Sequence, residues 1–237
     1  MKIKKVSDQI SRKFKLRVLH ISDTHGGFPD LYGRFDCVLH TGDFFPNSKA
    51  QYNGDKSQEA IFQLNWLKEK IPEIKKWLRG HTFLYVLGNH DFIFHNFVEQ
   101  ELTSAGIKSF DLTDKTVMYE GVNFYGFPYI PFIDGSWNYE RQIPEMQAEV
   151  DKMIDVLNQS YVDVLACHAP PYPHLDLTIG NEAVGSTVIS HALDYKLQKE
   201  MMPQYYCCGH IHEAHGITMR NGLCISNAAL TRHIIEI

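Results

Sequence analysis

The fold of this chain is decided by the stretch LRVLHISDTH, residues 16–25, in which an apolar run of strand length ends in a carboxylate and an imidazole. The same order of features recurs along the chain. Phe35–His40 precedes Gly42-Asp43, Thr82–Leu87 precedes Gly88-Asn89-His90-Asp91, Val162–Cys167 precedes His168, and Gln204–Cys208 precedes Gly209-His210-Ile211-His212. Folds of the α/β class build active sites where the carboxyl ends of strands meet. The sequence therefore predicts an α/β protein in which these five blocks form one site.

The segments between these strands predict helices and a hairpin. Helices are expected over Gln58–Lys70 with Asp55 as the cap, over a short piece after Pro72, over Asn96–Ser104, from Pro144 to Leu157, and from Ser186 to Lys199. Strands are expected over Thr116–Tyr119 and Val122–Phe127 as a hairpin, and over Gly216–Met219, Leu223–Ser226 and Arg232–Ile237. The polar segment Pro46–Lys56 is expected to be a loop.

Length and composition predict one domain over residues 1–237. A net charge of −5 argues against a protein that coats nucleic acid or an anionic membrane, although a small nucleotide is compatible because bound cations reverse the local charge. No apolar run approaches the ~20 residues of a membrane span, and no apolar segment of a signal peptide follows the N-terminus. The five cysteines lack metal-binding spacing and are expected to be small core residues. We therefore expect a cytoplasmic protein with no membrane partner.

The first fifteen residues form a basic N-terminal extension. Six cations stand there against a single acid, Asp8. Val6, Ile10 and Phe14 recur every four residues, which predicts a short amphipathic helix. Two roles are open for its charge, a flap that contacts substrate or a partner, and a solvated face of the protein.

The donors in the five blocks suit two divalent cations. Imidazole, carboxylate and amide oxygen bind Mn²⁺, Fe or Zn²⁺, and the absence of cysteine from the blocks argues against a thiolate zinc site. Asp23 and His25 can turn toward one ion, and Asp43 can bridge two ions because a carboxylate has two oxygens. Two residues apart, His210 and His212 suit an extended segment from which both side chains point into one cleft.

Taken in order, Asp-x-His, Gly-Asp, Gly-Asn-His-Asp, His and Gly-His-x-His resemble the signature of calcineurin-like metallophosphoesterases, from Leu16 to the C-terminus. Three longer stretches resemble the branch related to class III cyclic-nucleotide phosphodiesterases: YGFPYIPF at 125–132, HAPPYPHLD at 168–176 and GHIHEAHG at 209–216. The resemblance implies two mixed β-sheets packed as a sandwich and flanked by helices. It also implies two metal sites, one of Asp23, His25, Asp43 and His212 and the other of Asp43, Asn89, His168 and His210. Mn²⁺ is the first expectation, with Fe or Zn²⁺ as alternatives.

Two residues beside the metal ligands are expected to be catalytic. A hydroxide that bridges the metals is expected to attack phosphorus in line. His90 would stabilise the transition state or protonate the leaving oxygen, with Asp91 holding its imidazole in the correct tautomer. Substrate contacts are expected from Tyr129, Tyr172 and His174, for which packing of the loop is an equal alternative. His20 and His40, inside apolar strands, are expected to be core or supporting histidines.

The leading interpretation is a phosphodiesterase for a small nucleotide-type phosphodiester. A phosphomonoesterase or a nuclease is the alternative among enzymes, and a basic face or a further domain would favour the nuclease. A non-catalytic interaction module on the same fold is the alternative of another class, which the loss of a ligand would indicate. Every expected ligand is present. The substrate and the oligomeric state do not follow from the sequence.

Overall fold

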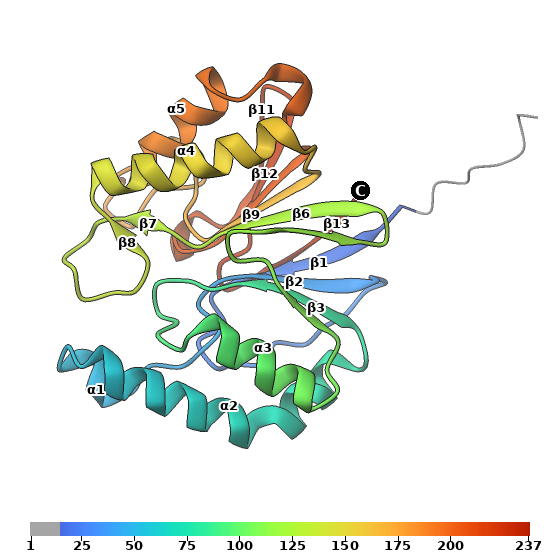
Figure 1. Ribbon diagram of the computed structural model, residues 1–237, viewed down its shortest axis with the longest axis vertical. Coiled ribbons are helices and arrows are strands. Elements are labelled where there is room, and N and C mark those ends of the chain that lie inside the picture. The colour runs from blue at the N-terminus through green and yellow to red at the C-terminus, as the bar shows by residue number, and fades with distance from the viewer. Residues whose placement is uncertain (1–14) are drawn as a thin grey trace, which may run out of the picture.

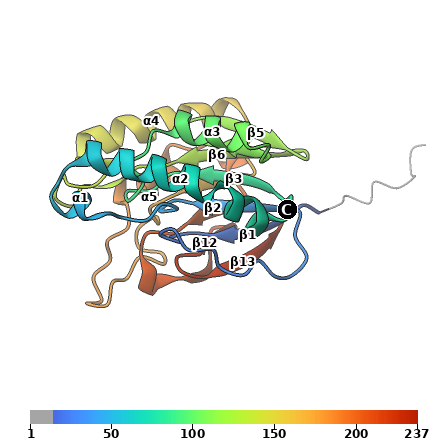
Figure 2. The same cartoon turned by 90° about the horizontal axis from the view of Figure 1, so that it is seen from below.

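The computed structural model describes residues 15–237, and its elements stack in four layers. From top to bottom in Figure 1, these are α4 (Ile143–Gln159) with α5 (Thr187–Tyr195), a six-stranded sheet, a five-stranded sheet, and α2 (Lys56–Leu78) with α3 (His95–Ser104). Figure 2, seen from below, shows α2 in front of β2 and β3 of the five-stranded sheet. The expectation of two mixed sheets flanked by helices is confirmed.

The five-stranded sheet has the order β13-β1-β2-β3-β4. Its strands are β1 (Arg17–Ile21), β2 (Cys37–Thr41), β3 (Thr82–Val86), β4 (Ser109–Asp111) and β13 (Arg232–Glu236). β1 to β4 run parallel, and β13 pairs with β1 in the antiparallel sense. Every residue of β2 and β3 is buried, as expected for parallel strands covered on both faces.

The six-stranded sheet has the order β11-β12-β10-β9-β6-β5. Its strands are β5 (Thr116–Tyr119), β6 (Val122–Phe127), β9 (Val164–Cys167), β10 (Tyr205–Cys208), β11 (Gly216–Arg220) and β12 (Leu223–Asn227). The four central strands are parallel, and each edge strand is antiparallel to its neighbour. The predicted hairpin of β5 and β6 turns at Glu120 and Gly121, both with positive φ. A small ladder joins β7 (Ile130–Pro131) to β8 (Glu140–Arg141).

Apolar side chains from the two sheets share one core. Val18, Leu39 and Val86 of the five-stranded sheet pack in one cluster with Phe124 and Val164 of the six-stranded sheet. Two other clusters fill the spaces between each sheet and its helices. Four of the five cysteines are buried and all five are free, in line with their predicted role as core residues.

His20 lies within this inter-sheet core and forms its main polar cross-link. Its Nδ1 lies 2.8 Å from Ser226 Oγ on the opposite sheet, and its Nε2 lies 2.9 Å from Thr41 Oγ1. Ser226 Oγ in turn lies 2.8 Å from His233 Nδ1. Burial, together with the neighbouring His233 and His40, holds the pKa of His20 well below its usual range. His20 is therefore a neutral core residue, as the sequence predicted.

The helices on the five-stranded sheet differ from the prediction at Pro72. The sequence predicted a break there, but α2 continues through it to Leu78. A proline inside a helix removes one hydrogen bond. Burial of Leu67 on one side of the proline and of Ile74 and Leu78 on the other offsets that loss. The predicted cap is confirmed, because the Asp55 side chain accepts the N–H of Gln58.

Three smaller expectations also need correction. The loop predicted over Pro46–Lys56 contains a short helix, α1 (Lys49–Tyr52), because Ser48 caps it. The helix expected to reach Lys199 ends at Tyr195, after which Leu197 turns into the core and a 3₁₀ turn covers Lys199–Met201. β4 was not predicted, since three residues carry too little periodicity.

The predicted basic extension over residues 1–15 lies outside the described residues, apart from Lys15. Within residues 15–237, no helix combines the length and the apolar character that a membrane crossing requires.

Leu39→Ala tests the inter-sheet core. We expect it to lower the free energy of unfolding by about 2–5 kcal/mol, because Leu39 is fully buried and truncation leaves a cavity. Denaturant unfolding followed by circular dichroism measures the change. Leu177→Ala is the matched control, because Leu177 is 49% exposed. Equal unfolding midpoints for the two variants would contradict the position of Leu39 in the core.

Candidate metal centre

The predicted blocks meet where strands of both sheets end. Asp23, Asp43 and Asn89 follow β1, β2 and β3, while His168 and His210 follow β9 and β10. The backbone N–H of His210 donates to the Asp23 carboxylate at 3.0 Å, so a residue of one sheet is bonded to a ligand candidate of the other. The chain enters β1 from the right in Figure 1, and the site therefore lies at the left-hand ends of the strands in that view.

The backbone at this site is held in an unfavourable conformation. The φ angles of Asp23, His25, Asp43 and His210 are 57°, 44°, 58° and 68°. Left-handed backbone costs a non-glycine residue about 1–3 kcal/mol and persists only where the surroundings impose it. Such strain gathers at functional sites. This conformation occurs at four of the seven predicted ligands, where the surrounding structure imposes it.

The first group of donors consists of Asp23, His25 and His212. His212 Nε2 lies 3.3 Å from Asp23 Oδ1 and 3.5 Å from His25 Nε2. Asp23 is fully buried, and the two imidazoles are partly exposed. The hydrogen bond with the Asp23 carboxylate raises the pKa of His212 above its usual value. These three side chains form a compact donor set at the mouth of the site.

The expectation that His210 and His212 share an extended segment is wrong. His210 has positive φ, and a single 3₁₀ turn begins at His212. The turn follows from the close approach of Gly209 to the end of β1, where a Cβ atom would lie 2.1 Å from Asp23 Oδ2. It places His212 beside Asp23 and leaves the His210 ring 5.0 Å from the His168 ring, measured between centroids.

The second group of donors surrounds His168. Its Nε2 lies 2.9 Å from Asn89 Oδ1 and 3.4 Å from Asp43 Oδ1. Its Nδ1 lies 2.8 Å from the carbonyl oxygen of Thr41. A carbonyl oxygen only accepts hydrogen bonds, so Nδ1 carries the proton and Nε2 faces the two oxygens. Such a backbone partner is typical of a metal-binding histidine.

Asp43 and His168 each stabilise the charged form of the other. Burial alone would raise the pKa of Asp43, but the charge and the hydrogen bond of His168 lower it well below its usual range. Burial alone would lower the pKa of His168, but the Asp43 carboxylate raises it to about 9. By contrast, burial and the nearby His168 charge lower the pKa of His210 to about 3, so His210 is neutral.

The donor chemistry fits divalent cations. When His168 is neutral, its Nε2 carries a lone pair and no hydrogen. This lone pair then faces the oxygens of Asn89 and Asp43, which are also acceptors. A proton on Nε2 relieves this repulsion, and a divalent cation relieves it with more charge. Protons and metal therefore compete for the same lone pairs, as in other protein metal sites. The first group, Asp23 with His25 and His212, supplies the donors for another ion.

His90 lies between the donors and solvent. Its Nε2 is 4.0 Å from Asp43 Oδ2, and its Nδ1 is 2.5 Å from Asn47 Oδ1. Burial lowers the pKa of His90. Asn47 engages Nδ1, which leaves Nε2 as the nitrogen that faces the site. Asn47 could not be predicted from the sequence, because a single asparagine in a polar loop carries no motif.

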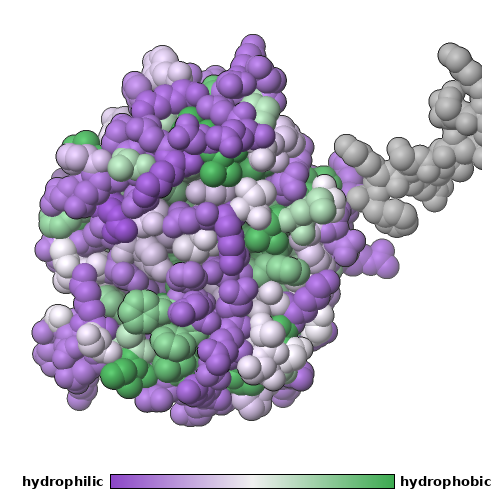
Figure 3. All heavy atoms as spheres, viewed as in Figure 1, coloured by the Kyte–Doolittle hydropathy of each residue, from purple (hydrophilic) through white to green (hydrophobic). Residues whose placement is uncertain are grey.

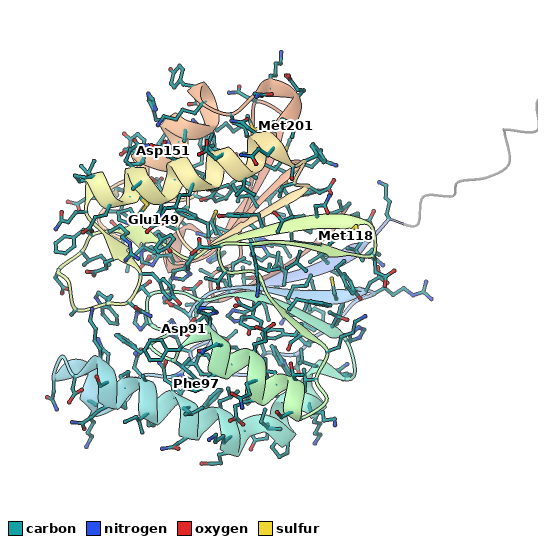
Figure 4. The ribbon with its side chains drawn as sticks, viewed as in Figure 1. Asp91, Phe97, Met118, Glu149, Asp151 and Met201 are labelled. Carbon is teal, nitrogen blue, oxygen red and sulfur yellow. The ribbon has the colours of Figure 1, made fainter. Side chains whose placement is uncertain are left out.

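The predicted contact between Asp91 and the His90 imidazole is wrong. Asp91 Oδ2 accepts the N–H groups of Asp43 at 2.9 Å and Gly88 at 2.8 Å, and Oδ1 accepts that of Phe45 at 2.9 Å. Burial and the Asp43 charge raise the pKa of Asp91 to about 7, and the N–H donors oppose the rise. Figure 4 labels Asp91 between α3 and the sheets. Asp91 thus positions two ligand loops and does not orient His90.

Comparison with known proteins agrees with this geometry. A family model described as calcineurin-like phosphoesterase matches residues 16–214. The chain belongs to the calcineurin-like phosphoesterase family. Members of this family are hydrolases that act on phosphoesters and typically depend on two metal ions. The predicted family membership is therefore confirmed.

Individual relatives are more distant. UPF0046 protein K07C11.7 of Caenorhabditis elegans is 28% identical over 90% of this chain and 69% of its own length. The human manganese-dependent ADP-ribose/CDP-alcohol diphosphatase is 27% identical, over 40% of this chain and 26% of its own length. A solved structure at 15% identity superposes with a TM-score of 0.73, covering 94% of this chain and 95% of the other, which shows the shared fold.

Two side chains of α2 support the centre of this calcineurin-like phosphoesterase. Buried Gln63 donates to the carbonyl oxygens of Pro46 and His90 and accepts the N–H groups of Phe92 and Ile93. One helical turn earlier, buried Glu59 accepts the backbone N–H groups of Ser48 and Gln51. Both residues are polar positions of an amphipathic helix, which sequence alone assigns to the solvent side.

The structure describes the surroundings of the three predicted substrate residues. Tyr129 is 8% exposed, and its hydroxyl donates to Asp114 at 2.7 Å. Tyr172 is 40% exposed in the loop before α5, and His174 in the same loop is partly buried near Arg220. Their roles stay predictions, with the Tyr129 hydroxyl already engaged inside the protein.

An apolar groove of about 530 Å³ borders the site on the α2 side. Its wall includes the segment after Asp91, the exposed rings of Phe94 and Phe97, Ile61 of α2, and Asn138. Figure 3 shows the apolar side chains gathered at the lower left, and Figure 4 labels Phe97 in that area. The surroundings of the site are therefore apolar on one side, in contrast to the acceptor-rich centre.

Asp91→Ala tests the positioning role of Asp91. Three buried N–H groups lose their acceptor, so we expect the free energy of unfolding to fall by at least about 3 kcal/mol. We also expect weaker Mn²⁺ binding, because the Asp43 and Asn89 loops lose their common anchor. Thermal unfolding with and without Mn²⁺ and metal analysis of the purified protein measure both effects. Asp155→Ala, at an exposed position of α4, is the control. Unchanged melting and metal content in Asp91→Ala would contradict this role.

Proposed function

We propose that this protein is a binuclear metal-dependent phosphodiesterase that acts on a small nucleotide-type phosphodiester. Family membership supports a metal-dependent phosphoester hydrolase. The three stretches that resemble cyclic-nucleotide phosphodiesterases support a diester substrate. The printed name of the human relative adds a nucleotide-containing substrate class, although that similarity covers only 40% of the chain.

The position of the Asp43 carboxylate is the observation that carries the proposal. It is buried between the His168 side, where Oδ1 lies 3.4 Å from Nε2, and the His90 side, where Oδ2 lies 4.0 Å from Nε2. We propose it as the ligand shared by two ions. The remaining ligands would be Asp23, His25 and His212 at one site and Asn89, His168 and His210 at the other. Mn²⁺ is our first choice of metal, and Fe or Zn²⁺ accept the same donors.

In this proposal, some residues of the protein position the metal ligands and His90 acts on the leaving group. Bound divalent ions supply charge that neutralises phosphoryl oxygens and lowers the pKa of water. His168 is fixed by Thr41, and the Asp43 and Asn89 loops are fixed by Asp91, so the ligands need little reorganisation when they bind. His90 presents Nε2 to the same cleft, where its doubly protonated form would hold the leaving oxygen and give it the Nε2 proton. The partner in this reaction is a small phosphoester, with no membrane involved.

Hydrolysis of two chromogenic substrates tests the proposal. We expect the purified protein with Mn²⁺ to hydrolyse bis-p-nitrophenyl phosphate faster than p-nitrophenyl phosphate, and EDTA to abolish both activities. A preference for the monoester would replace the proposal with a phosphomonoesterase. Cleavage of ADP-ribose without cleavage of the diester would replace it with a diphosphatase. Protein that holds two metal ions per chain but hydrolyses none of these would favour the interaction module.

His90→Ala tests the proposed acid. We expect kcat for the diester to fall by about a hundredfold or more, because general acid catalysis contributes about 10²–10⁴. The metal content should stay at the wild-type level, since His90 is proposed to act on the leaving group. His191→Ala, on the exposed side of α5, is the control. Loss of metal from His90→Ala would assign His90 as a ligand, a role its place beside His25 and Asp43 also permits.

A further inference from the structure

The nearest ring partner of His90 comes from a loop that no motif covers. The indole of Trp137 lies over the imidazole with 4.1 Å between ring centroids and a tilt of 37°. On its other flank, His90 meets the His25 ring edge-on at 4.8 Å. Trp137 is partly exposed, and within residues 15–237 His90 is its one aromatic partner. A large flat ring, partly open to solvent, therefore packs directly on the proposed acid.

The loop that carries Trp137 is anchored on both sides of the site. Lys56 Nζ donates to the carbonyl oxygens of Gly135 at 2.9 Å and Trp137 at 2.8 Å, which ties the loop to the start of α2. Asn138 N donates to the Asn89 carbonyl at 3.0 Å, and Asn138 Nδ2 donates to the Asp91 carbonyl at 2.7 Å. These hydrogen bonds therefore fix the position of the Trp137 loop relative to the loop that carries Asn89 and His90.

Trp137 differs in its surroundings from the other two tryptophans. Trp77 is buried in the core behind the five-stranded sheet, where its indole N–H donates to Pro29 O. Half-buried Trp66 packs against that core, on Phe28 and Phe45. Trp137 instead stands on a loop between two short strands, with part of its ring open to solvent. An aromatic side chain that a loop fixes beside a reactive centre suits recognition of a planar ring.

We infer that Trp137 forms a stacking platform for the aromatic ring of the substrate, a nucleobase or an equivalent aryl group. The inference rests on the proposed phosphodiesterase function and adds a substrate-recognition residue to it. With the phosphorus atom beside Asp43 and His90, the neighbouring indole lies where the organic group of a nucleotide extends from its phosphate. Stacking on a protein aromatic stabilises a bound base and tolerates any base, because every base has a flat face.

A matched ligand pair isolates the stacking contribution. AMP and ribose 5-phosphate share the phosphate and the sugar, and only AMP has a base. With Mn²⁺ present, we expect AMP to inhibit bis-p-nitrophenyl phosphate hydrolysis at about tenfold lower concentration than ribose 5-phosphate. We also expect AMP, and not ribose 5-phosphate, to quench tryptophan fluorescence. The fluorescence titration needs no turnover, so it tests the platform even if the protein fails to hydrolyse the diester.

Three variants assign the effect to Trp137. Trp137→Ala should remove the preference for AMP, whereas Trp137→Phe, which keeps a ring, should retain most of it. Both should lose the AMP-dependent quenching, because the rings of Trp66 and Trp77 pack on Phe44 and neither contacts the His90 ring. Phe132→Ala, an exposed aromatic position on the same loop, should behave as wild type. Trp137→Ala also weakens contact with His90, so a fall in kcat alone does not bear on base recognition.

Two results would overturn the inference. The first is equal inhibition by AMP and ribose 5-phosphate in wild-type protein that hydrolyses the diester. The second is an unchanged AMP preference in Trp137→Ala, which would reduce Trp137 to a residue that positions His90. Absence of Mn²⁺-dependent hydrolysis from the wild type, with AMP-specific quenching intact, would overturn the proposed phosphodiesterase activity and leave the platform standing.

Discussion

The Asp91 carboxylate, which has no access to solvent, holds together the two loops on which the rest of the site depends. It accepts N–H groups from the loop after β2, at Asp43 and Phe45, and from the loop after β3, at Gly88. Parallel neighbouring strands bring these loops close but do not fix their conformation. The shared carboxylate fixes the conformation of both loops. The strained backbone of Asp43 persists only because such surroundings impose it.

The second constraint is electrostatic. Asp23 and Asp43 are buried carboxylates that sit among imidazoles and an amide oxygen. Burial of a charge is costly unless another charge compensates it. Within the chain that compensation comes from His168 and His212, whose pKa values the carboxylates raise. Divalent cations would compensate the same carboxylates more completely, which explains why a fold would retain so unfavourable a cluster at the junction of its two sheets.

Supporting parts of the site come from elements that bear no motif. Gln63 and Glu59 of α2 hold the loops that carry His90 and Asn47, and Lys56 at the start of the same helix holds the Trp137 loop. One helix therefore sets the relative positions of the proposed acid, its amide partner and the aromatic platform. This division of roles, with ligands on strand ends and organic-group contacts on loops, is common in enzymes whose fold serves many substrates.

The sequence by itself determined the strands other than β4, β7 and β8, the order of the donors and the family, because periodic burial and metal-binding chemistry are local properties of the chain. It also determined the hairpin at Glu120-Gly121 and the cap at Asp55. Only the tertiary structure decided that α2 passes through Pro72, since packing on the sheet outweighs a local break. The tertiary structure also decided that the Asp91 carboxylate accepts backbone N–H groups and does not contact the His90 imidazole. It decided that the Asn47 side chain hydrogen-bonds to His90 and that the Trp137 ring packs on the His90 ring. These contacts join residues distant in sequence, and no local pattern encodes which partner a side chain will reach across a fold.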